Sequence, residues 1–360
     1  MKIVHVYKDA LPPLAAGITR YVAMVASAAA QRGHDVELHV AGVRASRRDV
    51  MPDGVVIYRW AELGRVLSNP LSPALIRAAR SVQGDVLHLH MPNPVGEAGA
   101  LSFRGPVVST FHAQLGKQKI LGPAYRPLQQ TLLRKSSTVF VSSPPMLEQE
   151  ELRNHRSRAI VLPFGVDPAL VNDRERTRQD DVLRLLFVGR LVYYKGLDVL
   201  LDSMAGLDRV QLTVIGDGPL RDQLEHRISA DPGLAGRVVM RGGVSDDELR
   251  RAYDEHDVFV APSVSRAEAF GISMAEALSN GMPAISTRLG TGTDWVNEHD
   301  VTGLVVEPRD GGALRDAVER LRDEGLWRRL SDSAREMAAR RYSSDAHFEV
   351  LLQHYEKAAS

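Results

Sequence analysis

The chain contains 360 residues with a mass of 39.6 kDa, and a composition of 44% hydrophobic and 25% charged residues is typical of a globular protein with about two domains. It has no cysteine, which excludes disulfides, cysteine-ligated metals and a thiol nucleophile. Residues 1–165 carry 20 Lys and Arg against 11 Asp and Glu, whereas residues 166–360 carry 25 against 34, so a basic half precedes an acidic one.

Short apolar runs in the first half alternate with helical patterns. Helices are predicted at 17–32 and 124–135, and strands are predicted at 2–7, 35–40, 55–60, 86–90, 106–112, 138–143 and 159–163. Strands that alternate with helices predict a parallel sheet covered by helices. The first strand begins at residue 2 without the layout of a signal peptide, so we expect a cytoplasmic protein.

A polar, charged run over 166–182 interrupts this pattern and predicts a linker. A second series follows, with strands predicted at 183–189, 210–215, 238–241, 258–261, 283–287 and 303–306. The last residues, 343–360, read as a further helix. We therefore expect an α/β protein of two Rossmann-like domains, 1–165 and 183–342. Open parallel sheets bind ligands beyond the carboxyl ends of their strands, so a ligand cleft is expected between the two domains.

Two glycine-containing loops follow strands of the second half. Gly189 ends the strand predicted at 183–189 and Arg190 directly follows it, with Lys195 five residues further on. Such a pair of cations can hold a diphosphate. Gly216 and Gly218 follow the next strand, where they permit a tight turn and close approach of a ligand. Each loop alone fits an ordinary solvated turn equally well.

Two glutamates eight residues apart, Glu268 and Glu276, enclose the strongest candidate site. If a helix begins near Gly271, the backbone N–H groups of Gly271, Ile272 and Ser273 form an anion site at its positive end. Glu268 then lies on the preceding loop, where it can accept hydrogen bonds from sugar hydroxyls. Glu276 lies inside the helix and can reach ribose hydroxyls. The alternative is a capped helix with two exposed acids.

The chain resembles the retaining family-4 glycosyltransferases of the GT-B fold over nearly its whole length. The Glu268–Glu276 pair matches that family's E-x7-E motif, and the resemblance extends to the Gly189 and Gly216 loops. In the first half it includes the segments 85–90 and 109–112. The resemblance implies a nucleotide-diphosphate sugar as the donor and a hydroxyl group as the acceptor. It also implies that the C-terminal helix crosses back to the first domain.

The resemblance also assigns roles to single residues. Arg190 and Lys195 clamp the donor diphosphate, Glu268 orients the donor sugar, Glu276 holds the ribose, and His112 lies beside the transferred sugar. Before the resemblance is considered, His112 fits a buried, hydrogen-bonded core histidine equally well.

The chain departs from the family pattern at two places. Gly17 falls where many relatives have two glycines that approach the phosphates, but Ala16 replaces the first of them. Some relatives follow the histidine with Ser-Asp, whereas this chain has Ala113 and Gln114. This difference removes an acidic contact on the acceptor side.

The charges favour a mechanism without a cofactor. Cleavage of the sugar–phosphate bond leaves an oxocarbenium-like sugar and a more negative diphosphate, which Arg190, Lys195 and the helix end at Gly271 can stabilise. We expect no metal and no cofactor. The base of the donor is open among UDP, GDP and ADP, and family frequency favours UDP or GDP. Competing functions are an epimerase or phosphorylase of similar architecture, a dinucleotide-dependent dehydrogenase, and a non-catalytic nucleotide-sugar-binding protein. The absence of GxGxxG after the first strand argues against the dehydrogenase.

A basic stretch over 115–135 follows His112. It has five cations and no acid, and apolar residues are interleaved among the cations. Such a stretch favours a phosphate-bearing or lipid-linked acceptor and peripheral contact with the inner membrane face. A core-facing helix with solvated cations explains the same pattern. No basic run interleaved with base-stacking aromatics occurs, so we expect no nucleic-acid partner.

Overall fold

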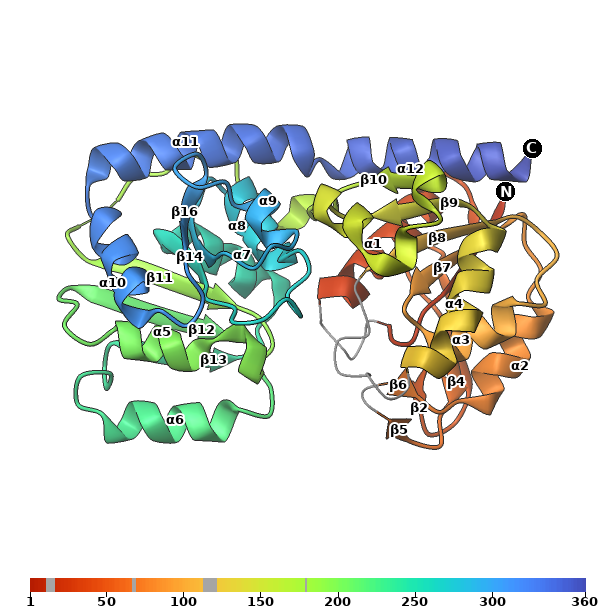
Figure 1. The fold of residues 1–360 in the computed structure, drawn as a ribbon, viewed down its shortest axis with the longest axis horizontal. Helices are drawn as coiled ribbons and strands as arrows, with labels where there is room; N and C mark the ends of the chain where they lie inside the picture. The colour runs from red at the N-terminus through yellow and green to blue at the C-terminus, as the bar shows by residue number, and fades with distance from the viewer. Residues whose placement is uncertain (11–16, 67–68, 113–121, 179) are drawn as a thin grey trace. The chain divides into compact units, whose positions relative to one another are not determined.

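The computed structural model describes residues 1–10, 17–66, 69–112, 122–178 and 180–360 (Figure 1). The chain forms two compact units. Unit 1 consists of Met1–Phe164 together with Asp345–Ser360, and unit 2 consists of Gly165–Ser344. Each unit is built around a sheet with parallel pairing, as the alternation of strands and helices predicts.

Unit 1 contains an eight-stranded sheet in the order β10-β9-β8-β7-β1-β2-β4-β3. Its strands are β1 (Lys2–Val6), β2 (Asp35–Val43), β3 (Arg47–Val50), β4 (Val56–Ala61), β7 (Val86–Met91), β8 (Val107–Phe111), β9 (Ser136–Val141) and β10 (Ala159–Val161). A separate two-stranded ribbon pairs β5 (Arg65–Val66) with β6 (Asn69–Pro70). The helices are α1 (Gly17–Gln31), α2 (Pro73–Ser81), α3 (Pro94–Ala100), α4 (Gly122–Lys135) and α12 (Ser344–Ala359).

The strand β3 is absent from the sequence-based prediction. It pairs antiparallel with β4 at the edge of an otherwise parallel sheet. Its sequence, Arg-Arg-Asp-Val, has no apolar run because the strand is largely exposed. A strand that buries neither face leaves no hydrophobic pattern, so only the pairing itself reveals it.

Unit 2 contains a six-stranded, fully parallel sheet in the order β13-β12-β11-β14-β15-β16. Its strands are β11 (Leu183–Val188), β12 (Val210–Ile215), β13 (Val238–Gly242), β14 (Val258–Ala261), β15 (Ala284–Thr287) and β16 (Gly303–Val306). Its helices are α5 (Leu197–Ser203), α6 (Arg221–Ala230), α7 (Asp246–Glu255), α8 (Ile272–Ser279), α9 (Thr293–Val296), α10 (Gly311–Arg320) and α11 (Glu324–Arg341). Numbered within the unit, the strand order is 3-2-1-4-5-6, as in dinucleotide-binding folds.

Residues 166–182, the expected linker, belong to unit 2 and are held against it. The guanidinium of Arg176 donates to the backbone carbonyls of Tyr253 and His256, and Arg178 donates to the carbonyl of Arg322 at 2.9 Å. Burial lowers the pKa of Arg176 to about 10. The arginines of this polar run therefore satisfy backbone carbonyls of unit 2.

Helix α12 packs within unit 1, although the chain reaches it from unit 2. Its buried face carries Phe348, Leu351 and Tyr355. The Tyr355 hydroxyl lies 2.5 Å from Nδ1 of His88, and His354 Nδ1 lies 3.1 Å from the Thr138 hydroxyl. The C-terminal helix thus returns to the first Rossmann-like unit, as the family resemblance implies.

Unit 1 also buries a carboxyl group, Glu97 on α3. Its side chain accepts the backbone N–H of Asn93 at 2.6 Å and the hydroxyl of Tyr125 at 2.6 and 2.7 Å. Burial nevertheless raises the pKa of Glu97 to about 7, because these hydrogen bonds to the carboxylate offset only part of the desolvation.

This shift predicts a pH-dependent stability. A carboxyl whose pKa is raised from 4.5 in the unfolded chain to about 7 in the folded protein stabilises the fold at low pH, and this contribution is lost as pH rises through about 7. Urea titrations at pH 4.5 and 8 will therefore show that the wild type loses on the order of 3 kcal/mol more than Glu97→Gln. Parallel pH profiles of the two proteins would contradict the burial argument.

Candidate functional site

The candidate site of unit 2 lies where the strand order of its sheet reverses. Strand β11 has β12 on one side and β14 on the other, and the connections from these two neighbours run in opposite directions. Loops after adjacent strands diverge at such a point and leave a crevice beyond the carboxyl ends. The loops after β11, β12 and β14 carry the predicted residues Arg190, Lys195, Gly216, Gly218 and Glu268.

Backbone hydrogen bonds join the first two of these loops. The N–H of Gly189 donates to the carbonyl of Ile215 at 3.0 Å, and the N–H of Leu191 donates to that of Asp217 at 2.9 Å. The approach is so close that a Cβ on Gly216 would lie 2.0 Å from the Gly189 oxygen, and one on Gly218 would lie 2.4 Å from the Leu191 oxygen. Gly216 also has φ +128°, which side chains rarely adopt. Glycine is therefore required for the packing of these loops.

Lys195 and Glu268 form an ion pair between the loop after β11 and the loop after β14. Their Nζ and Oε2 atoms are 2.5 Å apart, and the two side chains are 15% and 12% exposed. Burial alone would lower the pKa of Lys195, but the negative charge of Glu268 and the neighbouring Tyr194 outweigh it, so the pKa is raised. Lys195 is therefore a fixed positive charge at neutral pH.

The loop that carries Glu268 is itself fixed at several points. The Ser263 hydroxyl donates to Oε2 of Glu268 at 3.3 Å, and the Thr291 hydroxyl donates to the Glu268 carbonyl at 2.8 Å. The N–H of Val264 donates to the carbonyl of Tyr194 at 2.8 Å and so connects this loop to the one that carries Lys195. Both charges thus occupy defined positions before any ligand arrives.

Helix α8 starts next to this ion pair. Gly271 caps it with φ +87°, and the first turn contains Ile272 and Ser273, as the sequence predicts. The Ser273 hydroxyl donates to the Val188 carbonyl at 3.0 Å, which joins the helix start to the carboxyl end of β11. The N–H groups of the first turn of a helix have no partners within the helix, and the helix dipole makes this end positive.

Glu276 lies on the second turn of α8 and is buried. Its Oε2 accepts the hydroxyl of Tyr253 at 2.6 Å. The expectation of an exposed acid on a capped helix is therefore wrong for this residue. Arg190, in contrast, is exposed on the loop after β11. All of these residues belong to unit 2.

The two remaining predicted residues lie in unit 1. Gly17 is exposed at the first position of α1, and its neighbour Ala16 is outside the described residues, as are Ala113 and Gln114. His112 follows β8 and is buried, with Nε2 3.1 Å from Nδ1 of His90. Burial lowers the pKa of His112 to about 3, so the ring is neutral at neutral pH.

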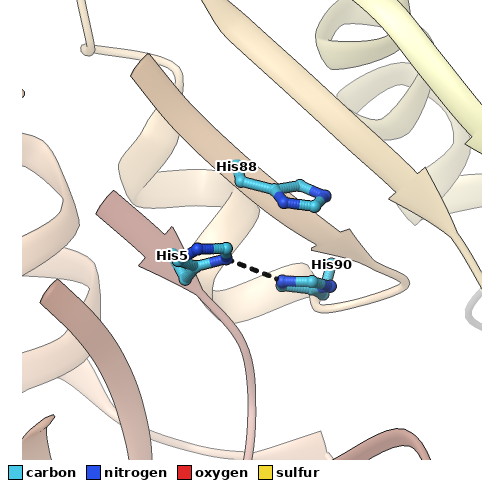
Figure 2. A group of neighbouring side chains, drawn as sticks. All are labelled: His5, His88 and His90. Carbon is cyan, nitrogen blue, oxygen red and sulfur yellow. Dashed lines mark hydrogen bonds between the residues drawn. The ribbon is translucent and has the colours of Figure 1, made fainter. Parts of the chain in front are cut away.

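Three further histidines lie close together, and sequence reasoning missed them as a group. Figure 2 shows His5 on β1 with His88 and His90 on β7; each offers a ring nitrogen within 4.8 Å of the others. Three histidines at this separation can hold a metal ion. Five of their six ring nitrogens, however, already have hydrogen-bond partners in the described protein. We therefore interpret them as a hydrogen-bonded network.

Comparison with known proteins identifies the family to which the chain belongs. Residues 183–324 match the family model described as "Glycosyl transferases group 1", and residues 15–170 match "Glycosyltransferase Family 4". The O-antigen chain mannosyltransferase C of Escherichia coli is 30% identical over 369 residues, which cover 99% of this chain and 98% of that protein. The D-rhamnosyltransferase WbpZ of Pseudomonas aeruginosa is 31% identical over 88% of this chain and 86% of its own length.

Among solved structures, sucrose-phosphate synthase from Thermosynechococcus elongatus matches with a TM-score of 0.82 and 21% sequence identity, and the match covers 100% of both chains. The two α/β units thus form the GT-B type of fold, a glycosyltransferase architecture. The chain belongs to the group 1, family 4 glycosyltransferases. No helix among the described residues is sufficiently long and apolar to cross a membrane.

The close approach at Gly216 predicts a clear effect of substitution. Gly216→Ala places a methyl group against the Gly189 oxygen at positive φ, so we expect the free energy of unfolding to fall by about 2 kcal/mol or more. Gly206→Ala is the matched control: φ is +79° there, nothing lies within 4 Å of the added Cβ, and the loss should be about 1 kcal/mol. Equal losses in urea denaturation would show that the loops can separate at no cost.

Proposed function

We propose that this glycosyltransferase moves a hexose from a UDP- or GDP-sugar to a hydroxyl group of an acceptor with retention of anomeric configuration. The observation that carries the proposal is the ion pair of Lys195 and Glu268 beside the start of α8. A cation and a helix N-terminus suit a diphosphate, and an adjacent carboxylate suits sugar hydroxyls.

Each residue has a role in this proposal. Arg190 and Lys195 bind the diphosphate, and the N–H groups of Gly271, Ile272 and Ser273 bind it from the helix end. The loop glycines Gly17, Gly216 and Gly218 allow the backbone to approach the donor. Glu268 orients the sugar, Glu276 holds the ribose, and His112 lies beside the transferred sugar. The similarity to a mannosyltransferase and a rhamnosyltransferase supports a sugar of the mannose type, because rhamnose is 6-deoxymannose.

The reaction exchanges one bond for another at the anomeric carbon. The bond between this carbon and the diphosphate oxygen breaks, and the acceptor oxygen forms a bond on the same face of the sugar. The acceptor proton passes to the departing phosphate oxygen, so the products are the glycoside and a nucleoside diphosphate. Lys195 stabilises the charge that develops on the leaving group, because its raised pKa keeps it protonated throughout. This route requires neither a protein nucleophile nor a metal ion.

The diphosphate clamp can be tested by kinetics. Lys195→Ala and Arg190→Ala should each lower turnover at least about tenfold, because each removes a charge-assisted contact to the leaving group. Arg340→Ala is the control, since Arg340 is an exposed cation of unit 2 that pairs with Glu336 on α11. Transfer from UDP- and GDP-sugars to a glycan acceptor would be followed by NMR, which also reports the anomeric configuration. Wild-type turnover of both variants at saturating donor would refute the clamp.

The same assay separates the alternative functions. A transferase consumes donor only when acceptor is present, whereas an epimerase or phosphorylase changes the sugar nucleotide without a hydroxyl acceptor. A non-catalytic binding protein changes nothing. Inversion of the anomeric configuration in the product would still show a transferase, but it would contradict attack on the same face of the sugar.

The acceptor is proposed to be lipid-linked or to carry a phosphate, and the protein is proposed to contact the inner membrane face from the cytoplasm. Support comes from the basic stretch 115–135, of which residues 115–121 lie outside the described residues. The described part of α4 buries Leu132 and Leu133 in the core of unit 1. Arg126 pairs with Glu150, and Lys135 donates to the carbonyl of Leu101 at 3.0 Å. Arg134 is exposed and donates to the neutral Thr131 hydroxyl at 3.0 Å. The membrane contact therefore depends mainly on Lys117, Lys119 and Arg134.

This proposal predicts salt-sensitive binding to anionic vesicles. The wild type should sediment with vesicles that contain anionic lipid and stay in solution with neutral ones, and the difference should fade as salt rises. The double variant Lys117→Ala, Lys119→Ala should bind less, whereas Arg126→Ala should behave as wild type because its charge is paired with Glu150. Negligible binding to both kinds of vesicle would favour a soluble acceptor.

A further inference from the structure

Four buried histidines lie at the carboxyl-end side of the unit 1 sheet, on three adjacent strands or directly after them. His5 on β1 is the register partner of His88 on β7. His90 lies two residues further along β7, so it shares a face of the sheet with His88. His112 follows β8 directly, and its backbone N–H donates to the Met91 carbonyl at 2.9 Å. None of the four side chains is more than 2% exposed.

Three of these rings form a continuous chain. Nδ1 of His5 lies 3.1 Å from Nε2 of His90 (Figure 2), and Nδ1 of His90 lies 3.1 Å from Nε2 of His112. The His5 and His90 planes differ by 17°, and the His90 and His112 planes by 13°. Within the described protein, the two outer nitrogens, His5 Nε2 and His112 Nδ1, have no hydrogen-bond partner. The chain thus begins at an unpaired nitrogen and ends at another.

His88 belongs to a different run, whose direction is fixed. The Pro163 carbonyl can only accept, so Nδ1 of His347 donates to it at 2.7 Å, and Nε2 of His347 then accepts the hydroxyl of Tyr21 at 3.1 Å. Tyr21 is also hydrogen-bonded to the side chain of Thr110. His88 Nε2 lies 2.7 Å from the Thr110 hydroxyl, and His88 Nδ1 lies 2.5 Å from the Tyr355 hydroxyl. This second run makes no hydrogen bond to the first, although the His88 and His90 rings are adjacent.

The chain of three rings has two possible directions. Burial lowers the pKa of each ring, so all three are neutral, with one N–H and one lone pair. When His5 donates from Nδ1, His90 and His112 must also carry their protons on Nδ1. When His112 donates from Nε2, all three protons are on Nε2. The tautomers of the three rings therefore change together.

A ligand at His112 decides between these directions. A ligand hydroxyl at Nδ1 of His112 can either donate or accept, so it satisfies that nitrogen in both directions of the ring chain. The two directions then differ in free energy through the unpaired Nε2 of His5. With all protons on Nδ1, His5 leaves a lone pair unsatisfied. With all protons on Nε2, it leaves a buried N–H unsatisfied, which is the rarer condition in proteins. The first direction is therefore favoured when a sugar is bound.

We infer that His5 and His90 are positioning residues that hold His112 in its Nδ1–H tautomer, so that His112 donates to a hydroxyl oxygen of the donor sugar. This inference rests on the proposed function for the place of the sugar beside His112. The coupling of the three tautomers does not depend on it, because that coupling follows from the two hydrogen bonds alone.

Nitrogen-15 NMR of histidine-labelled full-length protein tests the coupling directly, because a protonated ring nitrogen and one with a lone pair differ strongly in chemical shift. In the free protein, His5, His90 and His112 should share one tautomer. With GDP-mannose or UDP-glucose added, all three should carry the proton on Nδ1. Unlike tautomers along the chain, or three Nε2–H rings in the complex, would overturn the inference. If neither nucleotide sugar binds, the proposed donors fail, but the coupling in the free protein is still measured.

Kinetic measurements distinguish a role of His5 in positioning His112 from a role in core packing alone. His5→Phe fills the space of the ring but removes the hydrogen bond to His90. It should lower kcat/KM for the donor about tenfold. His5→Asn places an amide N–H near the position of Nδ1 and should restore it to within about threefold of wild type. His88→Asn, which cuts only the fixed run, should lower the melting temperature at least as much as His5→Phe with little change in kcat/KM. Equal losses of kcat/KM in His5→Phe and His88→Asn would show that His5 acts only in core packing.

Discussion

Parallel strand pairing is the constraint on which the rest of this structure depends. Every strand of the unit 2 sheet ends at the same edge, so residues far apart in the sequence follow neighbouring strands there. The pairing of β11 with both β12 and β14 places Lys195 and Glu268, which are 73 positions apart, at 2.5 Å. The loops at this edge are held by backbone hydrogen bonds and close glycine contacts, so the charges are in place without a ligand. Preorganised charge of this kind stabilises a transition state without the cost of rearrangement.

The sequence predicts most of the fold because buried parallel strands leave near-continuous apolar runs. Strands β11 to β16 all coincide with such runs, and α8 begins directly after Gly271 as the motif indicates. Strand β3 is missed because it is exposed, and the polar run over 166–182, predicted as a linker, also carries arginines that bind backbone carbonyls of unit 2. Composition reveals neither the pairing of β3 nor the contacts of these arginines.

The residues of the candidate site also differ in how well the sequence predicts them. The residues of unit 2 can be found from local motifs, because each follows a strand within a few positions. The histidine chain of unit 1 cannot, since it needs the register of β1 with β7 and of β7 with β8. Two signals in the sequence point to it in retrospect: the alternation of His88 and His90 along one strand, and His5 near the end of the first strand. Alternate residues share a face, but only the pairing shows which histidines meet.

Burial also fixes the charge of the histidine chain in unit 1. Burial keeps His5, His90 and His112 neutral, and the nearby charge of Lys8 further disfavours protonation of His112. A neutral ring donates one hydrogen bond and accepts another, but it adds no net charge. Under the proposed function, the positive charge that stabilises the diphosphate is therefore supplied by Arg190, Lys195 and the start of α8, all of which belong to unit 2. A cationic His112 would favour the oxocarbenium-like sugar less, because like charges repel at short distance. Neutrality of the imidazole chain is therefore as much a requirement of the proposed chemistry as the charge of Lys195.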